Sequence, residues 1–334
     1  MRGPNNCTAA SCAALPKSRF SDPMTLILLN PHAQGGRAAR AIPPFKNWLQ
    51  THAPDSSFAA PDKLQESLAL LQNLPEGSRV VAVGGDGTLN RWLPALLSRK
   101  LTLALVPMGS GNDCARALGL YGLSWTAALQ HALNGPARSV DTGLACWTDL
   151  QGQSHDTHFF SSLTAGFDSS VGLRALNGPR WLRGLPRYLW ATLKELAYLQ
   201  TWQLSVSADG EPMSSGPALF ASSLNTPSFG SGMPAVPHAR IDDGQLDALL
   251  AGPMGRSGVL NLLPRLLVGK HLTDPRLQCR PFKTLTIDCV DGVPLAADGE
   301  CLGLATQLRV HCQRARLQAV TRQTSSNRPP TMNA

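Results

Sequence analysis

The stretch RVVAVGGDGTLN, residues 79–90, begins as a short apolar strand at 80–83 and then breaks into glycines and an aspartate. After Thr88, leucine and tryptophan recur at helical spacing, so the sequence predicts a strand, a turn and a helix in direct succession. Glycines let the backbone take positive φ and approach a ligand closely. The first amides of the helix lack internal partners and suit an anion such as a phosphate. Asp86 would be repelled by bare phosphate, so it indicates a bridging metal ion or a proton transfer. The alternative is an ordinary turn in which the glycines serve geometry alone.

Two further stretches have the same arrangement. The apolar run at 25–29 leads into NPHAQGG, and the run at 101–106 leads into PMGSGND and a helix through Ala117. A helical pattern also runs through Ala41, is interrupted at Pro43 and Pro44, and resumes, and another is expected at 63–74. Alternating apolar strands and helices predict a parallel sheet covered on both faces. Because ligands of such sheets bind beyond the carboxyl ends of the strands, we expect the three polar loops to converge there.

The character of the chain changes after about residue 140. Short strand-like runs separated by turn residues predict an antiparallel β-domain, either a sandwich or a closed sheet, with two helical segments interposed. The runs are 159–163, 202–207, 218–224, 246–250, 284–289 and 307–311. We therefore expect domains at 24–140 and 141–320, with the last strand free to return to the first domain. Residues 1–23 and 321–334 are expected to be disordered tails, or Met24 is the true start.

Composition limits the class of protein. The 334 residues carry a net charge of +8, which favours an anionic partner: a membrane surface, a nucleic acid or a polyphosphate. No uninterrupted run of about 18 apolar residues and no signal-peptide core is present. The eight cysteines form no CxxC pair, and no His cluster has zinc-ligand spacing, so we expect reduced thiols in a cytoplasm.

The loop after the third apolar strand is a second candidate for phosphate and metal binding. Ser110 can donate its hydroxyl to a phosphate, and Asn112 and Asp113 can hold a nucleotide or a hydrated cation. Asp113 taken alone is better explained as a helix cap. Paired with the loop at 84–88, the functional interpretation is preferred.

These motifs together resemble a known family. VAVGGDGTLN followed by VPMGSGNDCARALG resembles the catalytic domain of the diacylglycerol kinase family, whose superfamily includes sphingosine kinases, ceramide kinases and the bacterial YegS-like lipid kinases. LLNPHAQGGRA resembles the first nucleotide loop, NTPSFGSGMPAVPHARIDDGQLDALL the Gly-rich loop and acidic turn, and LAADGECLG the terminal DGE motif. The five blocks occur in order over about 24–320. GGDGT alone is shared with NAD kinases and phosphofructokinases, whereas the order of all five is much more specific.

The resemblance implies a fold and a set of site residues. The fold would be α/β, with an N-terminal Rossmann-like parallel-sheet domain and a C-terminal antiparallel β-sandwich domain. Asp86 would work with Mg²⁺ at the phosphates of ATP, and Glu300 would accept the proton of the lipid hydroxyl. Asp243 would hold an accessory Mg²⁺ beside the carbonyls of Arg240 and Gln245. Residues matching ATP contacts are Asn30, Pro31, His32, Ala33, Gln34, Gly84, Gly85, Asp86, Gly87, Thr88, Leu89, Asn90 and Ser110. Without the family pattern, 298–300 and 242–244 would be assigned as simple turns.

The chain departs from the family pattern at three places. Gln34 stands where relatives often carry glycine, and Ser110 replaces the usual threonine. The family's hydroxyl-bearing site after the second strand falls near Ala59 or Ala60, so the resemblance leads us to expect one nucleotide contact fewer.

A basic and aromatic segment at 174–199 suits a membrane interface with anionic lipid, or else an amphipathic helix packed on the β-domain. Its residues are Arg174, Arg180, Arg183, Arg187 and Lys194 among Trp181, Tyr188, Trp190 and Tyr198. No recognition helix or RNA-binding motif occurs, so a nucleic acid partner is not expected. The sequence leaves a homodimer open.

The leading hypothesis is an ATP- and Mg²⁺-dependent kinase of diacylglycerol or a related long-chain lipid, cytoplasmic and peripheral at the inner membrane surface. A second hypothesis, based on GGDGT, is an NAD kinase-like enzyme with a soluble substrate. A third, based on Ala59 and Ala60, is a nucleotide-binding regulator without turnover. The catalytic hypothesis requires Glu300 and Asp86 to share one crevice.

Overall fold

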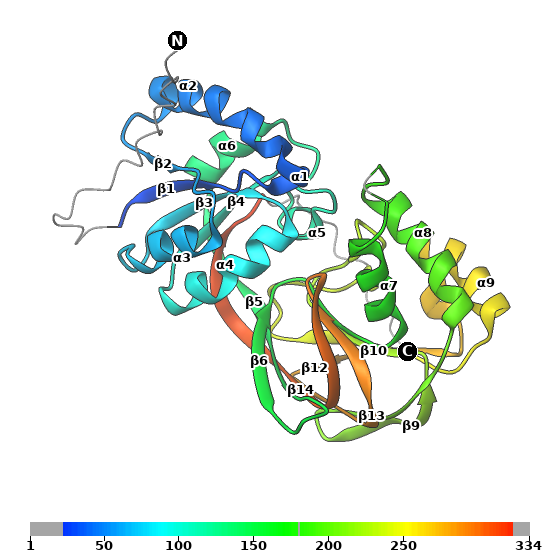
Figure 1. The fold of residues 1–334 in the computed structure, drawn as a ribbon. Coiled ribbons are helices and arrows are strands. Elements are labelled where there is room, and N and C mark those ends of the chain that lie inside the picture. The colour runs from blue at the N-terminus through cyan, green and yellow to red at the C-terminus, as the bar shows by residue number, and fades with distance from the viewer. Residues whose placement is uncertain (1–22, 180, 323–334) are drawn as a thin grey trace, which may run out of the picture.

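The computed structural model describes residues 23–179 and 181–322 (Figure 1). The predicted tails lie outside this part of the chain, except for residues 23, 321 and 322. Two lobes are visible in Figure 1, an N-terminal lobe of helices around a sheet and a C-terminal lobe rich in strands. Among the described residues, no helix is both long and apolar enough to cross a bilayer.

The N-terminal lobe is built on a parallel sheet with strand order β4-β3-β1-β2. Its strands are β1 (Thr25–Leu29), β2 (Ser57–Ala59), β3 (Arg79–Gly84) and β4 (Thr102–Pro107). The predicted apolar runs form β1, β3 and β4, whereas the short edge strand β2 has no apolar run and was located only by the resemblance, which places the end of a second strand near Ala59.

Helices cover both faces of this sheet, because successive strand residues point to opposite sides. Leu26 and Leu28 pack toward α3 (Leu64–Gln72), α4 (Asp86–Ser98) and α5 (Asp113–Ala117). Ile27 and Leu29 pack toward α2 (Ile42–His52) and α6 (Trp125–Asn134). The connection from β1 is completed by α1 (Ala33–Gly36) and η1 (Arg37–Ala41).

The predicted interruption at Pro43 and Pro44 is wrong. Both prolines lie in the first turn of α2. Proline is tolerated there because the first helical amides have no intrahelical acceptor, so the prolines begin the helix.

The C-terminal lobe is an antiparallel sheet with order β12-β11-β10-β7-β13-β14, to which β5, β6, β8 and β9 add. Its strands are β5 (Ala137–Thr148), β6 (Ser154–Phe159), β7 (Ser162–Ala165), β8 (Trp202–Ala208), β9 (Glu211–Ala218), β10 (Phe220–Leu224), β11 (Leu246–Ala251), β12 (Leu277–Phe282), β13 (Thr284–Ala297) and β14 (Glu300–Val320). The predicted run 159–163 is two strands with a break at 160–161. The runs at 284–289 and 307–311 are parts of much longer strands.

The described residues of this lobe form three helices rather than the two predicted: α7 (Phe167–Leu176), α8 (Leu185–Glu195) and α9 (Arg256–Leu267). The short turns η2 (Leu196–Tyr198) and η3 (His271–Thr273) follow α8 and α9. The basic and aromatic segment at 174–199 is therefore divided between α7 and α8 rather than forming one helix. A positive φ at Gly184, a conformation that favours glycine, precedes α8.

Strand β14 joins the two lobes. It pairs with β13 and β5, and its end pairs in parallel with β4 through Gln318 opposite Thr102. Leu308 and Val310 therefore belong to the core of the second lobe, whereas Leu317 belongs to the first. A register shift interrupts the β14–β5 ladder between Gln313 and Leu317, where Ala315 has a φ of 52°.

Candidate active site

A cleft of about 390 Å³ lies where the loops after β1, β3 and β4 face the second lobe. The convergence of the three polar loops, expected from the carboxyl ends of parallel strands, is therefore present in the structure. Eleven of the predicted site residues line the cleft: Asn30, His32, Ala33, Gln34, Gly85, Asp86, Gly87, Thr88, Ser110, Asp113 and Glu300.

Gly85 lets the β3 and β4 loops pack closely, and Gly84 lets the turn after β3 pack against Thr88 at the start of α4. A Cβ placed on Gly85 would lie 2.6 Å from the Cα of Gly109, and one on Gly84 would lie 2.6 Å from Oγ1 of Thr88. Neither contact is sterically allowed, so both positions require glycine. The close packing brings the start of α4 and the start of α5 to the same place.

The carboxylate of Asp86 is fixed by the N-terminus of α5. Its oxygens accept hydrogen bonds from the backbone N–H groups of Asp113 at 3.1 Å and Cys114 at 3.0 Å. Each carboxylate oxygen can accept more than one hydrogen bond or metal bond. Asp86 is therefore held in one orientation at the cleft with acceptor capacity remaining.

The β1 loop is connected to the β3 loop by side chains. Nδ2 of Asn30 donates to Oγ1 of Thr88 at 2.7 Å, and Oδ1 of Asn30 accepts from the backbone N–H of His32 at 3.0 Å. Gln34 has a φ of 54°, a left-handed conformation that favours glycine. This explains in physical terms why glycine suits that position in the resemblance.

Asn112 shapes the third loop and does not line the cleft. Its Oδ1 accepts from the backbone N–H of Gly109 at 2.8 Å, and its Nδ2 donates to the carbonyl of Gly109 at 3.0 Å. The side chain of Asn112 is thus used inside its own loop.

Asp113 links the two lobes. Its carboxylate accepts from Oγ of Ser228 at 2.9 Å and from the N–H groups of Ser231 at 2.8 Å and Gly232 at 2.7 Å. Burial, followed by the charge of Asp86, raises the pKa of this carboxyl, while the three hydrogen bonds oppose the increase. The cap assigned to Asp113 taken alone is wrong, because no side-chain cap bond is made at the start of α5.

The first two residues of the DGE motif, Asp298 and Gly299, form the two-residue hairpin turn between β13 and β14, and Glu300 begins β14. Asp298 and Gly299 have φ of 46° and 85°, as a type I′ turn requires. The Asp298 carboxylate accepts from the N–H groups of Phe160, Ser161 and Ser162 at 2.7–2.9 Å and from Nδ2 of Asn90 at 3.3 Å. The motif is therefore both a turn and part of the cleft.

Glu300 and Asp86 lie in the same cleft. Oε1 of Glu300 accepts from Nη2 of Arg91 on α4 at 2.9 Å, and it lies 3.4 Å from the position of a Cβ on Gly87, the residue after Asp86. The side chain of Glu300 is 36% exposed, so a substrate can approach it.

The remaining predicted site residues do not line the cleft. Leu89 is buried in the core of the first lobe, and Pro31, Gly84, Asn90 and Asn112 lie in or beside the same loops but outside the lining of the cleft. Arg240, Asp243 and Gln245 also lie away from it. Oδ1 of Asp243 accepts from the N–H of Gln245 at 3.1 Å, beside a surface hollow that Lys283 and Arg314 also line. Burial is the largest cause that raises the pKa of Asp243.

Several cleft residues were not predicted. They are Arg91, Ser161, Ser162, Thr164, Asp168, Arg187 and Tyr188. Burial, and then the charges of Asp113 and Asp86, raise the pKa of the Tyr188 phenol to about 12, so this hydroxyl stays protonated. Only the position of Arg91 could have been inferred from spacing, since it lies one helical turn after Gly87.

An apolar pocket of about 90 Å³ adjoins the cleft and shares Asp168, Tyr188 and Phe229 with it. Helices α7, α8 and α9 enclose it, and its other lining residues are almost all apolar, among them Phe167, Val171, Leu219, Phe220, Met233, Met254, Leu262 and Leu266. The arrangement therefore places a polar cleft beside an apolar one, with carboxylates at the polar end.

Family models match both lobes of the chain. The diacylglycerol kinase catalytic domain matches residues 24–145, and the YegS C-terminal NAD kinase beta sandwich-like domain matches residues 161–320. A diacylglycerol kinase of Mycobacterium tuberculosis is 32% identical over 222 residues, covering 66% of this chain and 70% of that protein. The chain belongs to the diacylglycerol kinase family. Membership confirms the resemblance and makes the protein, in the general sense, a lipid kinase and a phosphotransferase.

Other comparisons agree with this family. A Pseudomonas putida protein named "Probable lipid kinase YegS-like" is 31% identical, covering 66% of this chain and 72% of its own length. The crystal structure of a diacylglycerol kinase from Bacillus anthracis has a TM-score of 0.65 at 19% identity, covering 92% of this chain and 98% of its own. Yeast NADH kinase has a TM-score of 0.52 at 13% identity, covering 91% and 85%. These two structures concern the fold alone, and they confirm the predicted fold class.

Proposed function

We propose that the protein transfers the γ-phosphate of ATP to a hydroxyl of diacylglycerol or a related long-chain lipid, with Mg²⁺ as the metal. The observation that carries the proposal is the presence of Asp86 and Glu300 in one cleft that adjoins an apolar pocket. Phosphoryl transfer depends on positioning and charge neutralisation more than on covalent chemistry. The paired carboxylates and the glycine-lined loops support that chemistry.

Each part of the cleft has a role in this proposal. The loops containing Asn30, Gly85 and Ser110 bind the phosphates. Asp86, with its remaining acceptor capacity, holds Mg²⁺, which commonly binds through one or two carboxylates together with substrate phosphates. The metal neutralises charge on the phosphates when bound. The accessory site at Asp243, with the carbonyls of Arg240 and Gln245, remains part of the proposal and supports the lobe from outside the cleft.

Glu300 is the proposed proton acceptor. The lipid hydroxyl oxygen forms a bond to the γ-phosphorus, the bond from that phosphorus to the bridging oxygen breaks, and ADP leaves. The hydroxyl proton passes to the carboxylate of Glu300, which Arg91 orients through its hydrogen bond.

The apolar pocket is the proposed site of the acyl chain. At about 90 Å³ the pocket is smaller than a long acyl chain, so it must widen for the chain to enter. Asp168 and Tyr188, at the boundary between pocket and cleft, then face the polar part of the lipid.

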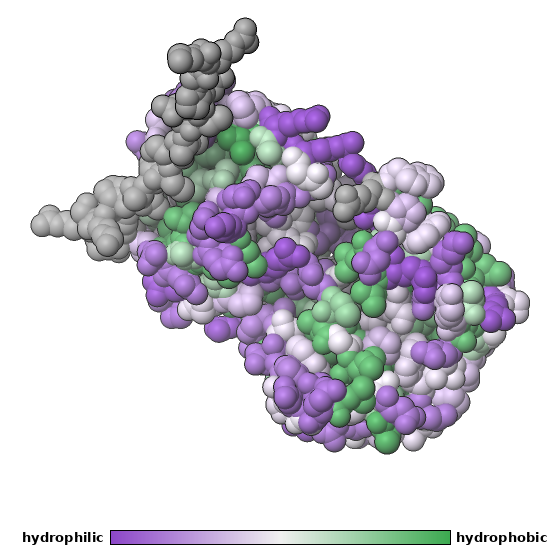
Figure 2. All heavy atoms as spheres, in the orientation of Figure 1, coloured by the Kyte–Doolittle hydropathy of each residue, from purple (hydrophilic) through white to green (hydrophobic). Residues whose placement is uncertain are grey.

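We also propose that the protein binds an anionic membrane surface from the cytoplasmic side through α8 and the turns beside it. Trp181 before α8, Leu193 near its end and Tyr198 in η2 are 79%, 55% and 67% exposed, so large apolar side chains face solvent along this segment. Figure 2 shows hydrophobic and hydrophilic residues interspersed over α7–α9. Since Tyr188 and Thr192 of the same helix line the apolar pocket, a membrane in contact with α8 lies next to the proposed lipid entrance.

The test is a kinase assay with labelled ATP, Mg²⁺ and mixed bacterial lipids, with mass spectrometry of the products. Asp86→Ala and Glu300→Gln are each expected to lower the rate by about a hundredfold or more. Glu76→Gln, which removes an exposed ion pair with Lys100 before β3, is the matched control and should retain activity. Full activity of Asp86→Ala would overturn its assignment.

The same assay, repeated with NAD as the acceptor and with a broad panel of lipids, separates the other two hypotheses. Phosphorylation of NAD without phosphorylation of any lipid would support the soluble-substrate enzyme. ATP binding without transfer to any acceptor across a broad lipid panel would support the regulator.

A further inference from the structure

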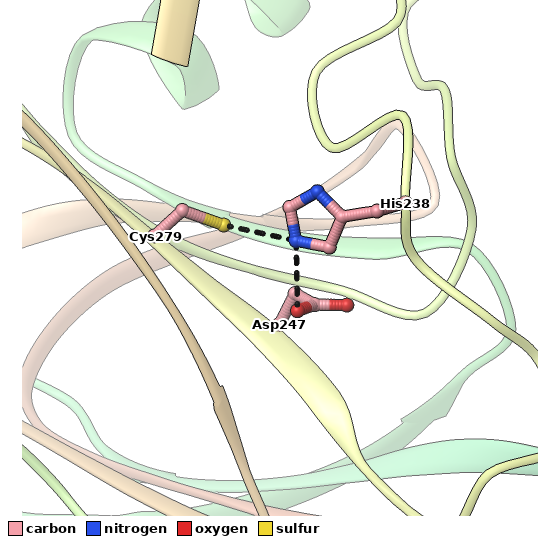
Figure 3. Close-up of side chains that lie close together, drawn as sticks. All are labelled: His238, Asp247 and Cys279. Atoms are coloured by element: carbon pink, nitrogen blue, oxygen red, sulfur yellow. Dashed lines mark hydrogen bonds and ion pairs between the residues drawn. The ribbon is translucent and has the colours of Figure 1, made fainter. Parts of the chain in front are cut away.

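Three side chains of different chemistry converge on the surface of the second lobe, away from the cleft (Figure 3). Nε2 of His238 lies 3.6 Å from Oδ1 of Asp247 and 3.8 Å from Sγ of Cys279. The three donor atoms all lie within 4.8 Å of one another. They come from β11, from β12 and from the loop that precedes β11.

The fold fixes two of the three positions. Leu249 of β11 lies directly opposite Cys279 of β12, so Asp247, two residues before Leu249, points to the same face as Cys279. His238 reaches this face because its loop packs there through the buried residues Val236 and Ala239, which share a small core with Leu249. The convergence is therefore built by strand register and loop packing.

The geometry excludes a catalytic relay. In a nucleophile–His–carboxylate relay, the carboxylate and the nucleophile bind opposite nitrogens of the ring. Here Asp247 and Cys279 both approach Nε2 of His238. Burial, and then the charge of Asp247, also raise the pKa of the Cys279 thiol to about 12, which makes it a poor nucleophile.

We propose that His238, Asp247 and Cys279 form a binding site for a divalent transition-metal ion of the zinc class. In a tetrahedral zinc site, the usual bond lengths place neighbouring ligand atoms about 3.3 to 3.5 Å apart. Movements well under 1 Å would bring the His238 pairs to that separation. The side chain of His238 is 58% exposed, so a water molecule can complete the coordination.

The donor set selects the class of ion. Thiolate and imidazole are ligands of zinc and its neighbours, whereas Mg²⁺ prefers oxygen. Binding releases the thiol proton of Cys279 to solvent and leaves the metal–sulfur bond in its place. The site is thus independent of the Mg²⁺ chemistry proposed for the cleft.

A bound ion would connect the loop before β11 to the β11–β12 pair. The same loop supplies Ser231 and Gly232, whose N–H groups bind Asp113 in the cleft. Metal binding is therefore expected to stabilise the loop that joins the second lobe to the nucleotide side.

The test is a Co²⁺ titration of the full-length chain carrying Cys7→Ser and Cys12→Ser, so that only thiols of the described residues remain. We expect about one Co²⁺ per chain, with a sulfur-to-cobalt charge-transfer band that Zn²⁺ abolishes by displacement. Cys279→Ser should lose the band, and His238→Ala, at an exposed position, should weaken binding by about tenfold or more. Cys301→Ser, at an exposed cysteine elsewhere, is the control and should retain the band.

Thermal unfolding with and without Zn²⁺ distinguishes a loss of metal binding from a loss of folding in the variants. Zn²⁺ should raise the thermal midpoint of the parent chain by several degrees but leave that of His238→Ala almost unchanged. Persistence of the band in Cys279→Ser, or no saturable Co²⁺ binding by the parent chain, would disprove the site.

Discussion

At the scale of single residues, the cleft contains two kinds of carboxylate. Asp113 and Asp298 accept hydrogen bonds from backbone N–H groups and so fix the loops, whereas Asp86 and Glu300 are proposed to act in catalysis. Asp298 accepts hydrogen bonds from three successive N–H groups and from Asn90. Asp113 accepts from the loop of the opposite lobe. Substitution of these residues should therefore affect folding as much as the chemical step.

Asp298→Asn tests this structural role. An asparagine amide oriented toward the same N–H groups presents a donor where an acceptor is needed, so we expect a loss of about 1–3 kcal/mol in the free energy of unfolding. Urea unfolding measures it. Asp62→Asn, at a side chain that is 81% exposed, is the control and should change stability little. Equal stability of the two variants would contradict the assigned role.

Asp168 gives a pH-dependent prediction. Burial raises the pKa of its carboxyl to about 6, although hydrogen bonds from Ser222 and the N–H of Ser169 favour the charged form. Because the folded-state pKa exceeds the unfolded value, the contribution of Asp168 to stability is present below about pH 4 and is lost as the pH rises through about 6. The loss is at most about 3 kcal/mol.

Asp168→Asn lacks this titration. The free energy of unfolding of the variant minus that of the unsubstituted chain should therefore be more positive at about pH 8 than at about pH 4.5. Urea unfolding of both proteins at both pH values measures this difference. Asp55→Asn, at an exposed position, should show no such difference. A stability difference that is independent of pH would contradict the raised pKa.

The sequence predicted the central residues of the site but not their partners. Asp86 and Glu300 were recognisable because each lies in a motif with its own local spacing. The place of Asp168 in the cleft and the hydrogen bonds from the amides of 160–162 to Asp298 depend on contacts between residues far apart in the chain, for which local spacing carries no signal. The cluster of His238, Asp247 and Cys279 was missed for the same reason, since its members come from three separate segments.

At the scale of elements, helix α8 has two different surfaces. Tyr188 and Thr192 line the apolar pocket, whereas Lys194 is exposed. The predicted basic face is smaller than the sequence indicated. Arg174 pairs with Glu195, Arg187 binds the carbonyls of Leu182 and Pro179, and Arg180 lies outside the described residues. Arg183 and Lys194 remain as the exposed basic residues of this segment.

Membrane binding through α8 should therefore depend on few side chains. Trp181→Ser combined with Lys194→Glu should lower binding to vesicles that contain anionic lipid by about tenfold, measured by cosedimentation. Val290→Ser, at an apolar side chain that is 90% exposed in the other part of the lobe, is the control. Unchanged binding by the double variant would disprove the proposed surface.

The sequence predicted correctly those strands of the first lobe that consist of an uninterrupted run of apolar residues. β1, β3 and β4 are buried on both faces and have uninterrupted apolar runs, which single them out. β9 is largely exposed and rich in serine and proline, and β12 carries Gln278 and Arg280, so neither has a run of that kind. Their pairing is set by neighbouring strands, which no local pattern specifies.

At the scale of the whole molecule, the two lobes share their strands. β14 and β5 run from the core of the second lobe into the first. The lobe boundary inferred from the change in composition is therefore not a linker. We expect the lobes to unfold together, in contrast to domains joined by a flexible segment.

Leu317→Ala tests this coupling. Leu317 is 1% exposed in the core of the first lobe, so its truncation should cost about 3 kcal/mol. Calorimetry should show a single transition shifted to lower temperature. Leu304→Ala, on the same strand but 41% exposed, should shift it by less than about 1 kcal/mol. Two separate transitions, with only one shifted, would contradict the coupling.

The irregularity at Ala315 has a consequence for motion around the cleft. It lies where β14 leaves one core for the other, and the Asp141 carboxylate accepts from the N–H of Ala315 at 2.6 Å and from that of Gly244 at 2.7 Å. A continuous hydrogen-bonded ladder resists bending, so a change in the angle between the two lobes should bend the β14–β5 ladder most readily at this interruption. Because the Asp141 carboxylate binds both amides, bending beyond the reach of this one side chain would break at least one of the two hydrogen bonds.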